Sequence, residues 1–207
     1  MTDETRNPWI RTRRDTVYQN EWIEVWHDEV TRPDGGPGIY GVVHFRSQAV
    51  GVVALDGEDR VLLVGQYRYT LDRFSWEIPE GGSPREEDPL VGAQRELAEE
   101  TGFSAAHWRE LIRFTLSNSV TDEEGVMYLA TDLTPGPTNP DATEELHVRW
   151  VPLEQALVMV ETGIIHDLMS QGALLAVARE RATARGRDNE GPARRPALPH
   201  RAASRDA

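Results

Sequence analysis

Residues 81–103 constrain the fold of this chain more than any other stretch, because they mark both ends of a helix. Asp88 stands directly before Pro89, and an Asp N-cap followed by proline at the first helical position is a helix-start signal. A rival start at Pro84 would leave Pro89 in the helix interior, where proline removes a hydrogen bond. Gly102 suits a left-handed C-terminal cap. The segment therefore predicts a helix that begins after Asp88 and ends at Gly102.

Three carboxylates share one face of this predicted helix. Glu96, Glu99 and Glu100 fall at i, i+3 and i+4, spacings that bring side chains together. They repel one another and lie near the negative end of the helix dipole, so we expect a cation to neutralise them. Hard divalent cations such as Mg²⁺ select carboxylate oxygens. The alternative is a solvated acidic helix face, which is the usual interpretation of a run of charges.

The residues around these carboxylates match a known pattern. Gly81, Glu87, Arg95 and Gly102 stand with them in the order G-x5-E-x7-R-E-U-x-E-E-x-G-U, where U is apolar. This resembles the Nudix box at every fixed position and every spacing, which disfavours the solvated face. The resemblance implies an enzyme that hydrolyses a nucleoside diphosphate linked to another group, with Mg²⁺ or Mn²⁺ as cofactor.

The resemblance also implies roles for residues next to the helix. Arg95 would pair with Glu87 and tie the preceding loop to the helix. Gly81 and Gly82 would let the chain turn sharply and bring a backbone carbonyl near the metal. That carbonyl belongs here to Glu80, where many relatives have alanine; a backbone ligand does not depend on the side chain. The implied metal ligands are Glu80, Glu96, Glu99 and Glu100, and Glu99 and Glu100 are also counted as catalytic.

Strand and helix signals alternate through the rest of the chain. Residues 16–46 predict an antiparallel hairpin of two strands around a dense turn signal at 33–38. Further strands are expected at 49–55, 61–66, 108–116, 126–132 and 146–151, and helices at 153–161 and 166–181, while residues 74–79 lead into the box. Mixed strands with helices on both sides suit an α/β/α sandwich, the fold class of Nudix proteins. We expect a β arm at 1–46, a Nudix domain at 47–181 and a disordered basic tail at 182–207.

Two short segments resemble the ADP-ribose and nucleoside diphosphate sugar branch of the family. Residues 66–68 (QYR) and 76–81 (WEIPEG) are similar to the Q-Y-R and E-x-P-A-G patterns of that branch. By this resemblance Arg68 would contact the diphosphate and Glu77 a neighbouring polar group. The alternative for each is a surface or edge-strand side chain.

One position departs from the ADP-ribose pattern. Enzymes of that kind carry a proline in the loop after the box, and this chain has Asn118 there. Thr121 and Glu123 of the same pattern remain, and Glu123 is a candidate substrate contact. The missing proline leaves room for nucleoside diphosphate sugars other than ADP-ribose.

The expected reaction is attack of water on one phosphorus, which gives a nucleoside monophosphate and a sugar phosphate. Divalent ions on the box carboxylates would bridge the diphosphate and neutralise developing charge. Related enzymes draw a general base from a mobile loop late in the chain, and residues 138–145 form a polar loop of that kind. Glu144 is the first candidate and Glu145 the second. The alternative is two solvent-facing acids before a strand.

Aromatic residues are dense in the N-terminal arm. Tyr18 and Trp22 are candidates for stacking on the substrate base. The alternative is that they pack in a core or a dimer interface. Similar hairpins in the ADP-ribose branch reach across a dimer partner, so the resemblance implies a homodimer.

Composition limits the partners and the location. The formal charge of -13 argues against a nucleic-acid groove, which needs a basic patch. No window approaches the apolar length that spans a membrane, and the N-terminus lacks the apolar segment of a signal peptide. The chain has no cysteine and so no disulfide framework, which mildly favours a cytoplasmic location.

Three other functions remain open from the sequence. The first is a Nudix hydrolase of a nucleoside triphosphate, a dinucleoside polyphosphate, NADH or coenzyme A. The second is an inactive Nudix domain that senses a nucleotide, although such domains usually lose a box carboxylate and this chain keeps all of them. The third is an interaction module served by the tail, where eight arginines accompany four acidic residues from position 179 onward. A passive terminus is the alternative for that tail.

Overall fold

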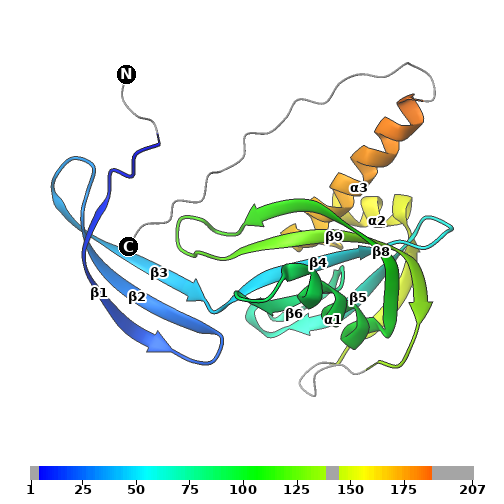
Figure 1. Ribbon diagram of the computed structural model, residues 1–207, viewed down its shortest axis with the longest axis horizontal. Helices are drawn as coiled ribbons and strands as arrows, with labels where there is room; N and C mark the ends of the chain where they lie inside the picture. The colour runs from blue at the N-terminus through cyan, green and yellow to red at the C-terminus, as the bar shows by residue number, and fades with distance from the viewer. Residues whose placement is uncertain (1–4, 139–144, 188–207) are drawn as a thin grey trace.

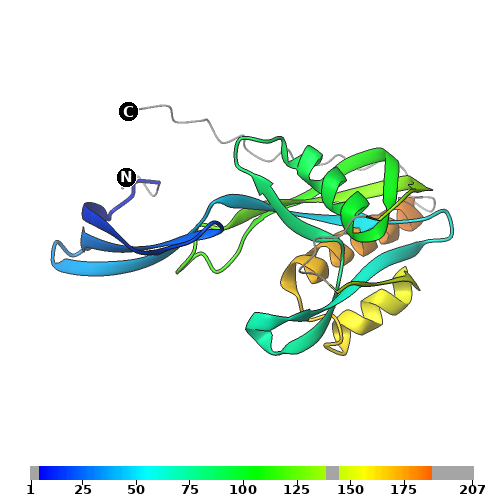
Figure 2. The same cartoon turned by 90° about the horizontal axis from the view of Figure 1, so that it is seen from below.

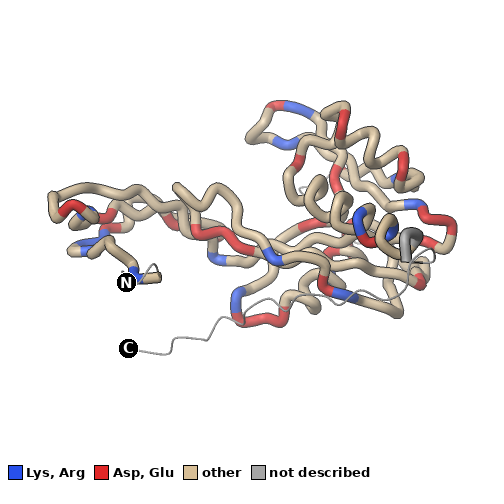
Figure 3. The backbone as a smooth tube through the Cα atoms, turned by 90° about the horizontal axis from the view of Figure 1, so that it is seen from above, with Lys and Arg blue, Asp and Glu red and all other residues tan. Residues whose placement is uncertain are grey.

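The computed structural model describes residues 5–138 and 145–187, which form an N-terminal sheet that extends from a larger body (Figure 1). The chain passes from the sheet into the body where β3 (Pro37–Phe45) is followed by β4 (Ser47–Ala54). Acidic and basic positions are interspersed along both parts (Figure 3). None of the helices in these described residues is long and apolar enough to cross a membrane.

The N-terminal sheet has three antiparallel strands in the order β1-β2-β3. They are β1 (Ile10–Gln19), β2 (Ile23–Thr31) and β3 (Pro37–Phe45). The predicted hairpin corresponds to β2 and β3, and Gly35 supplies the positive φ (83°) of its turn. Sequence reasoning missed most of β1, because this strand is exposed on both faces and carries no alternation of apolar and polar residues.

The body contains two further sheets. A four-stranded mixed sheet has the order β7-β4-β9-β8, with β4 and β9 parallel, and a three-stranded antiparallel sheet has the order β10-β5-β6. Their strands are β4 (Ser47–Ala54), β5 (Arg60–Arg68), β6 (Arg73–Glu77), β7 (Glu80–Pro84), β8 (Phe103–Thr115), β9 (Glu124–Pro135) and β10 (His147–Pro152). A short 3-10 turn, η1 (Tyr69–Leu71), joins β5 to β6.

Three helices cover the two sides of the sheets, which confirms the predicted α/β/α sandwich with a mixed sheet. α1 (Pro89–Thr101) lies on one side, and α2 (Leu153–Glu161) and α3 (Leu168–Arg187) lie on the other (Figure 2). The central strand β4 faces both cores, because Val50 and Val52 pack with α1 while Val53 packs with α2 and α3. Burial on both faces explains why residues 49–54 contain no polar side chain.

Several elements differ in extent from those expected, and one strand was not expected. α3 continues to Arg187, past the end expected at Arg181, because the alanine and arginine residues that follow are good helix formers. β7 was not expected as a strand, since its sequence EGGSP lacks β-formers. It forms because it pairs antiparallel with β4, from Ser47 opposite Pro84 to Gly51 opposite Glu80. Residues 188–207, most of the expected tail, lie outside the described part of the chain.

Candidate active site

The box helix begins and ends where the sequence predicts. Pro89 is its first residue, and the Asp88 side chain accepts a hydrogen bond from the Leu90 backbone N–H at 3.0 Å. Gly102 closes the helix in the left-handed conformation, with φ 72°, and its N–H donates to the Ala98 carbonyl. Both ends are therefore fixed by local interactions, which a sequence pattern can report.

Arg95 and Glu87 form the ion pair that the Nudix resemblance implied, with 3.0 Å between Arg95 Nη1 and Glu87 Oε2. The same guanidinium donates to the Gly82 carbonyl at 3.0 Å, and Ser83 Oγ donates to Glu87 Oε2 at 2.9 Å. The hydrogen bond from Arg95 holds the pKa of Glu87 below its usual range. These contacts tie β7 and its loop to the face of α1.

The paired glycines of the box do not make the sharp turn that was expected of them. Gly81 and Gly82 lie within the extended strand β7. Gly81 is needed for another reason: a Cβ atom there would lie 2.4 Å from Glu96 Cδ. The glycine thus lets the strand and the carboxylate of the helix approach each other closely.

Glu96 and Glu100, two of the three box carboxylates, lie against β7. Glu100 is buried, and its Oε2 accepts a hydrogen bond from the Glu80 backbone N–H at 3.2 Å. Glu96 lies against Gly81, and Glu99 is half-buried. Within residues 5–138 and 145–187, no three His, Asp or Glu side chains form a group that could hold a metal ion. The described residues therefore bring Glu96 and Glu100 to β7 without closing a cluster of three ligands.

Arg68 and Glu77 do not face outward as separate substrate contacts. Arg68 Nε lies 3.0 Å from Glu77 Oε2, and Arg68 Nη2 lies 2.9 Å from Glu80 Oε1. Glu77 is buried, and Arg68 is partly buried between the two carboxylates. Although burial opposes it, the hydrogen bonds from Arg68 to Glu77 raise the pKa of the guanidinium. The surface alternative does not describe Glu77, and contacts of Arg68 and Glu77 with the substrate stay predictions.

The Glu80 side chain is a feature that sequence reasoning set aside. Burial, followed by the carboxylates of Asp167 and Glu77, raises the pKa of Glu80 well above its usual range. Its Oε2 has no hydrogen-bond partner among the described residues. Asp167 also went unnoticed; it accepts a hydrogen bond from Ser170 N–H at 2.6 Å at the start of α3. The departure from alanine at position 80 was the available signal.

The remaining candidates are spread over the molecule. Glu123 is half-buried in the loop before β9, and burial together with Asp122 raises the pKa of Glu123. Tyr18 and Trp22 lie on the arm with 54% and 66% of their surfaces exposed, so neither packs in a core within the chain. Glu145 is exposed just before β10, and Glu144 lies outside the described residues.

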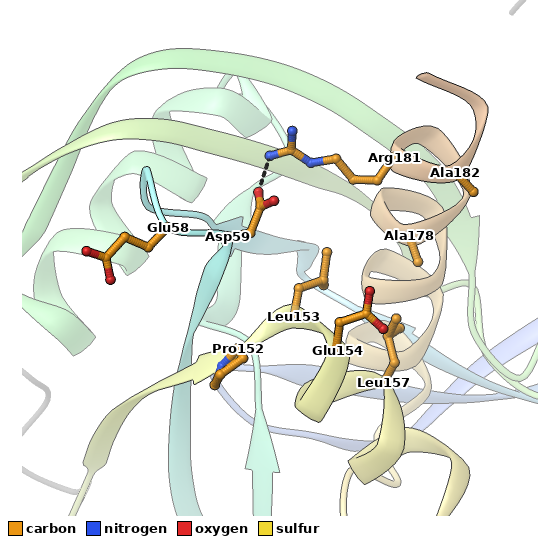
Figure 4. A pocket seen from close by; sticks show the side chains of 9 residues that line it. All are labelled: Glu58, Asp59, Pro152, Leu153, Glu154, Leu157, Ala178, Arg181 and Ala182. Carbon is orange, nitrogen blue, oxygen red and sulfur yellow. Dashed lines mark hydrogen bonds and ion pairs between the residues drawn. The ribbon is translucent and has the colours of Figure 1, made fainter. Parts of the chain in front are cut away.

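A cavity of about 260 Å³ lies apart from these residues, between the β4–β5 turn, the start of α2 and the end of α3 (Figure 4). Arg181 Nη2 and Asp59 Oδ1 form an ion pair at 2.6 Å at its rim, and Leu153 and Leu157 contribute apolar walls. None of the residues expected to bind metal or substrate lines it.

Comparison with known families agrees with this geometry. The model of the NUDIX domain matches residues 45–168, which include β7, α1 and the carboxylates of Glu96, Glu99 and Glu100. The chain belongs to the Nudix family. A second model, the nucleoside diphosphate sugar hydrolase N-terminal domain, matches residues 15–43 of the arm of this Nudix protein.

Several characterised proteins are similar to this Nudix chain over most of their length. An ADP-ribose pyrophosphatase of Mycobacterium tuberculosis is 33% identical over 79% of this chain and 80% of its own. An ADP-ribose pyrophosphatase of Bacillus subtilis is 30% identical over 78% of this chain and 88% of its own. A CMP-5'-(N-acetyl-N-hydroxy-3-aminopropyl)phosphonate hydrolase of Streptomyces rubellomurinus is 31% identical over 75% of each chain.

A solved crystal structure of an ADP compounds hydrolase has the same fold as this Nudix protein. The TM-score is 0.77 over 86% of this chain and 96% of that one, at 23% sequence identity. The covered share includes more than the NUDIX match alone, so the likeness extends beyond the box and its sheet. The predicted resemblance to the Nudix family is confirmed.

Proposed function

We propose that this Nudix protein hydrolyses the pyrophosphate bond of a nucleoside diphosphate sugar, ADP-ribose or a related compound. The products would be a nucleoside monophosphate and a sugar phosphate. The observation that carries the proposal is the complete box: Glu96 and Glu100 meet β7 at one edge, and the Glu87–Arg95 pair holds the loop in place. The two ADP-ribose pyrophosphatases among its relatives support the choice of substrate class.

The residues at this edge fit a divalent cation, Mg²⁺ or Mn²⁺, because they offer carboxylate and carbonyl oxygens only. A buried carboxylate oxygen of Glu80 without a hydrogen-bond partner adds to that acidic donor set. The ligands would be Glu96, Glu99, Glu100 and the Glu80 carbonyl. The bound ion would supply charge neutralisation at the diphosphate.

The chain's own residues prepare this edge. The Glu80 N–H holds the Glu100 carboxylate toward β7, and Arg95 fixes the loop through Glu87 and the Gly82 carbonyl. Arg68 balances the charge of the neighbouring carboxylates of Glu77 and Glu80, which keeps the pair buried beside the site. Desolvated like charges without such a partner would be costly.

Other parts of the proposal rest on the family resemblance. Glu144 or Glu145 would act as general base, and Glu123, Tyr18 and Trp22 would contact the substrate. Residues 1–46 would form an arm that pairs two subunits in a homodimer, ahead of a Nudix domain at 47–181 and a basic tail at 182–207. A cytoplasmic location and the lack of a nucleic-acid partner complete the proposal.

Product analysis with a substrate panel tests the activity. The panel contains ADP-ribose, other ADP-, UDP- and GDP-sugars, NADH, dinucleoside polyphosphates, coenzyme A and nucleoside triphosphates, each with Mg²⁺ or Mn²⁺. We expect a nucleoside monophosphate and a sugar phosphate from several sugar nucleotides. Cleavage restricted to triphosphates, dinucleotides or coenzyme A would move the protein to another branch. Binding without turnover would mean a sensor.

A further inference from the structure

The arm meets the body at Asp122, a residue to which no role in the reaction has been assigned above. Asp122 Oδ2 lies 2.5 Å from His44 Nδ1, and its Oδ1 accepts a hydrogen bond from the Phe45 N–H at 3.1 Å. The Asp122 N–H in turn donates to the Val43 carbonyl at 3.3 Å. Three consecutive residues at the end of β3 are thus held by one residue of the body.

Arg85 brings the Nudix box into the same junction. This residue lies in the box loop between β7 and α1, and its Nε donates to the Phe45 carbonyl at 2.9 Å. Its Nη2 lies 3.4 Å from the Asp122 carbonyl and 3.6 Å from Asp122 Oδ1. The end of the arm, the box loop and the loop before β9 therefore share one set of contacts.

Neighbouring contacts strengthen the junction on the side of the arm. Tyr40 Oη donates to the Ser119 carbonyl at 3.0 Å, and the Val43 N–H donates to the Val120 carbonyl at 2.8 Å. The His44 ring stacks on Trp26 with 4.4 Å between centroids, which fixes the imidazole that faces Asp122. Although burial opposes it, the hydrogen bonds from His44 and Phe45 hold the pKa of Asp122 below its usual range.

We infer that Asp122 is a positioning residue that sets the arm against the box loop. The loop that carries Asp122 also carries Glu123, a candidate substrate contact, so the same junction fixes the spacing between arm, Glu123 and box. Its consequence for catalysis rests on the proposed function, in which the arm contributes to substrate binding. Asp122 remains 39% exposed, so its effect is on geometry more than on the electrostatics of the site.

The test compares Asp122→Asn with a matched control, Asp132→Asn. Asp132 Oδ2 also pairs with a histidine, His107 Nδ1 at 2.7 Å, but this exposed pair joins two strands of the body. Hydrogen exchange would be measured along β3, and kcat and KM with the preferred substrate of the panel. In Asp122→Asn we expect faster exchange at residues 42–46 and a KM raised by about tenfold, equivalent to roughly 1.4 kcal/mol, with kcat nearly unchanged. In Asp132→Asn we expect the exchange at these residues and the KM to stay as in the unaltered protein.

Two variants of His44 separate positioning from general destabilisation. His44→Asn keeps a hydrogen-bond donor near the Nδ1 position and should retain a near-normal KM. His44→Ala should show the faster exchange and the raised KM expected for Asp122→Asn. Unchanged exchange in Asp122→Asn, or faster exchange with unchanged KM, overturns the inference. If the unaltered protein turns over nothing in the panel, the proposed function fails instead, and the exchange difference between Asp122→Asn and Asp132→Asn alone decides the inference.

Discussion

The box segment and the N-terminal arm differ in how their structures are specified. Along the box, the stabilising partners are near in sequence: Asp88 caps Leu90, and Glu87 pairs with Arg95. In the arm, the decisive partners are distant, since His44 meets Asp122 78 residues further on. Glu100 of the box is buried, whereas Trp22 of the arm is exposed. Local contacts thus define the ends of the box helix, whereas long-range contacts place the arm beside the box loop.

The two regions also differ in how their buried acidic side chains are partnered. The arm has its own buried pair, in which Asp28 is 4% exposed and Arg14 Nε lies 2.7 Å from Asp28 Oδ1. The guanidinium of Arg14 lies 3.7 Å from the centre of the Trp26 ring. This pair joins β1 to β2, whereas Glu96 and Glu100 of the box lie against β7. Substitutions in the box should therefore lower turnover, whereas substitutions at the buried pair of the arm should lower the free energy of unfolding.

The largest expected effect is on turnover and comes from the box. Glu100→Gln keeps an oxygen that accepts from the Glu80 N–H but loses the charge proposed to bind the cation. We expect kcat to fall by about 100-fold or more, with an unchanged fold by circular dichroism. Glu110→Gln, on the exposed Glu110–Arg113 pair, is the control and should retain activity. Near-normal turnover of Glu100→Gln would remove the metal assignment.

The next effect is on stability and comes from the arm. Asp28→Asn leaves Arg14 without its charged partner and should lower the free energy of unfolding by about 2 kcal/mol. The hydrogen bond from Arg14 holds the pKa of Asp28 below its usual value. This stabilisation is therefore present above about pH 4 and is lost as pH falls through the lower folded value.

Denaturant unfolding at several pH values measures that difference. The gap between Asp28→Asn and the unaltered protein should narrow on acidification below about pH 4. A gap that stays constant down to pH 2 would contradict the role of the ionised pair.

A smaller effect is expected at the start of the box helix. Asp88→Ala removes the cap from Leu90 and should cost about 1 kcal/mol of unfolding free energy, whereas Asp88→Asn should stay close to the unaltered protein. Chemical denaturation measures both. Equal losses in the two variants would show that charge, rather than the cap hydrogen bond, stabilises this end.

The smallest effect is expected from the exposed pair of the body. Asp132→Asn removes the charge that faces His107, and both side chains are at least 70% exposed. We expect a change within about 0.5 kcal/mol in unfolding free energy and no change in kcat or KM. A larger loss of unfolding free energy would mean that this exposed pair stabilises the protein more than exposed ion pairs usually do.

Sequence reasoning was strongest where the signals are local and repeated. The helix after Asp88, its end at Gly102 and the helix 153–161 were predicted, and the structure places them at those residues. The pair Glu87–Arg95 was predicted from the family pattern and is present. The roles of the site residues in catalysis stay predictions, because they depend on a ligand as well as on the chain.

Sequence reasoning was weakest for strands that exist only through their partners. β1 is polar and exposed, and β7 is rich in glycine, so neither carries the alternation that identifies a strand. β1 forms against β2, and β7 forms against β4. Backbone hydrogen bonds to these partner strands compensate for the weak β propensity of the two sequences. A local sequence pattern does not report such pairing.

The sequence by itself determined the family, the mixed α/β fold and the helix that carries Glu96, Glu99 and Glu100. These follow from spacing, caps and apolar runs, which act between residues that are close along the chain. Only the tertiary structure decided that Arg68 is shared by Glu77 and Glu80, and that Asp122 holds the arm. Those contacts join residues brought together by sheet pairing and burial, so their energies depend on the completed fold.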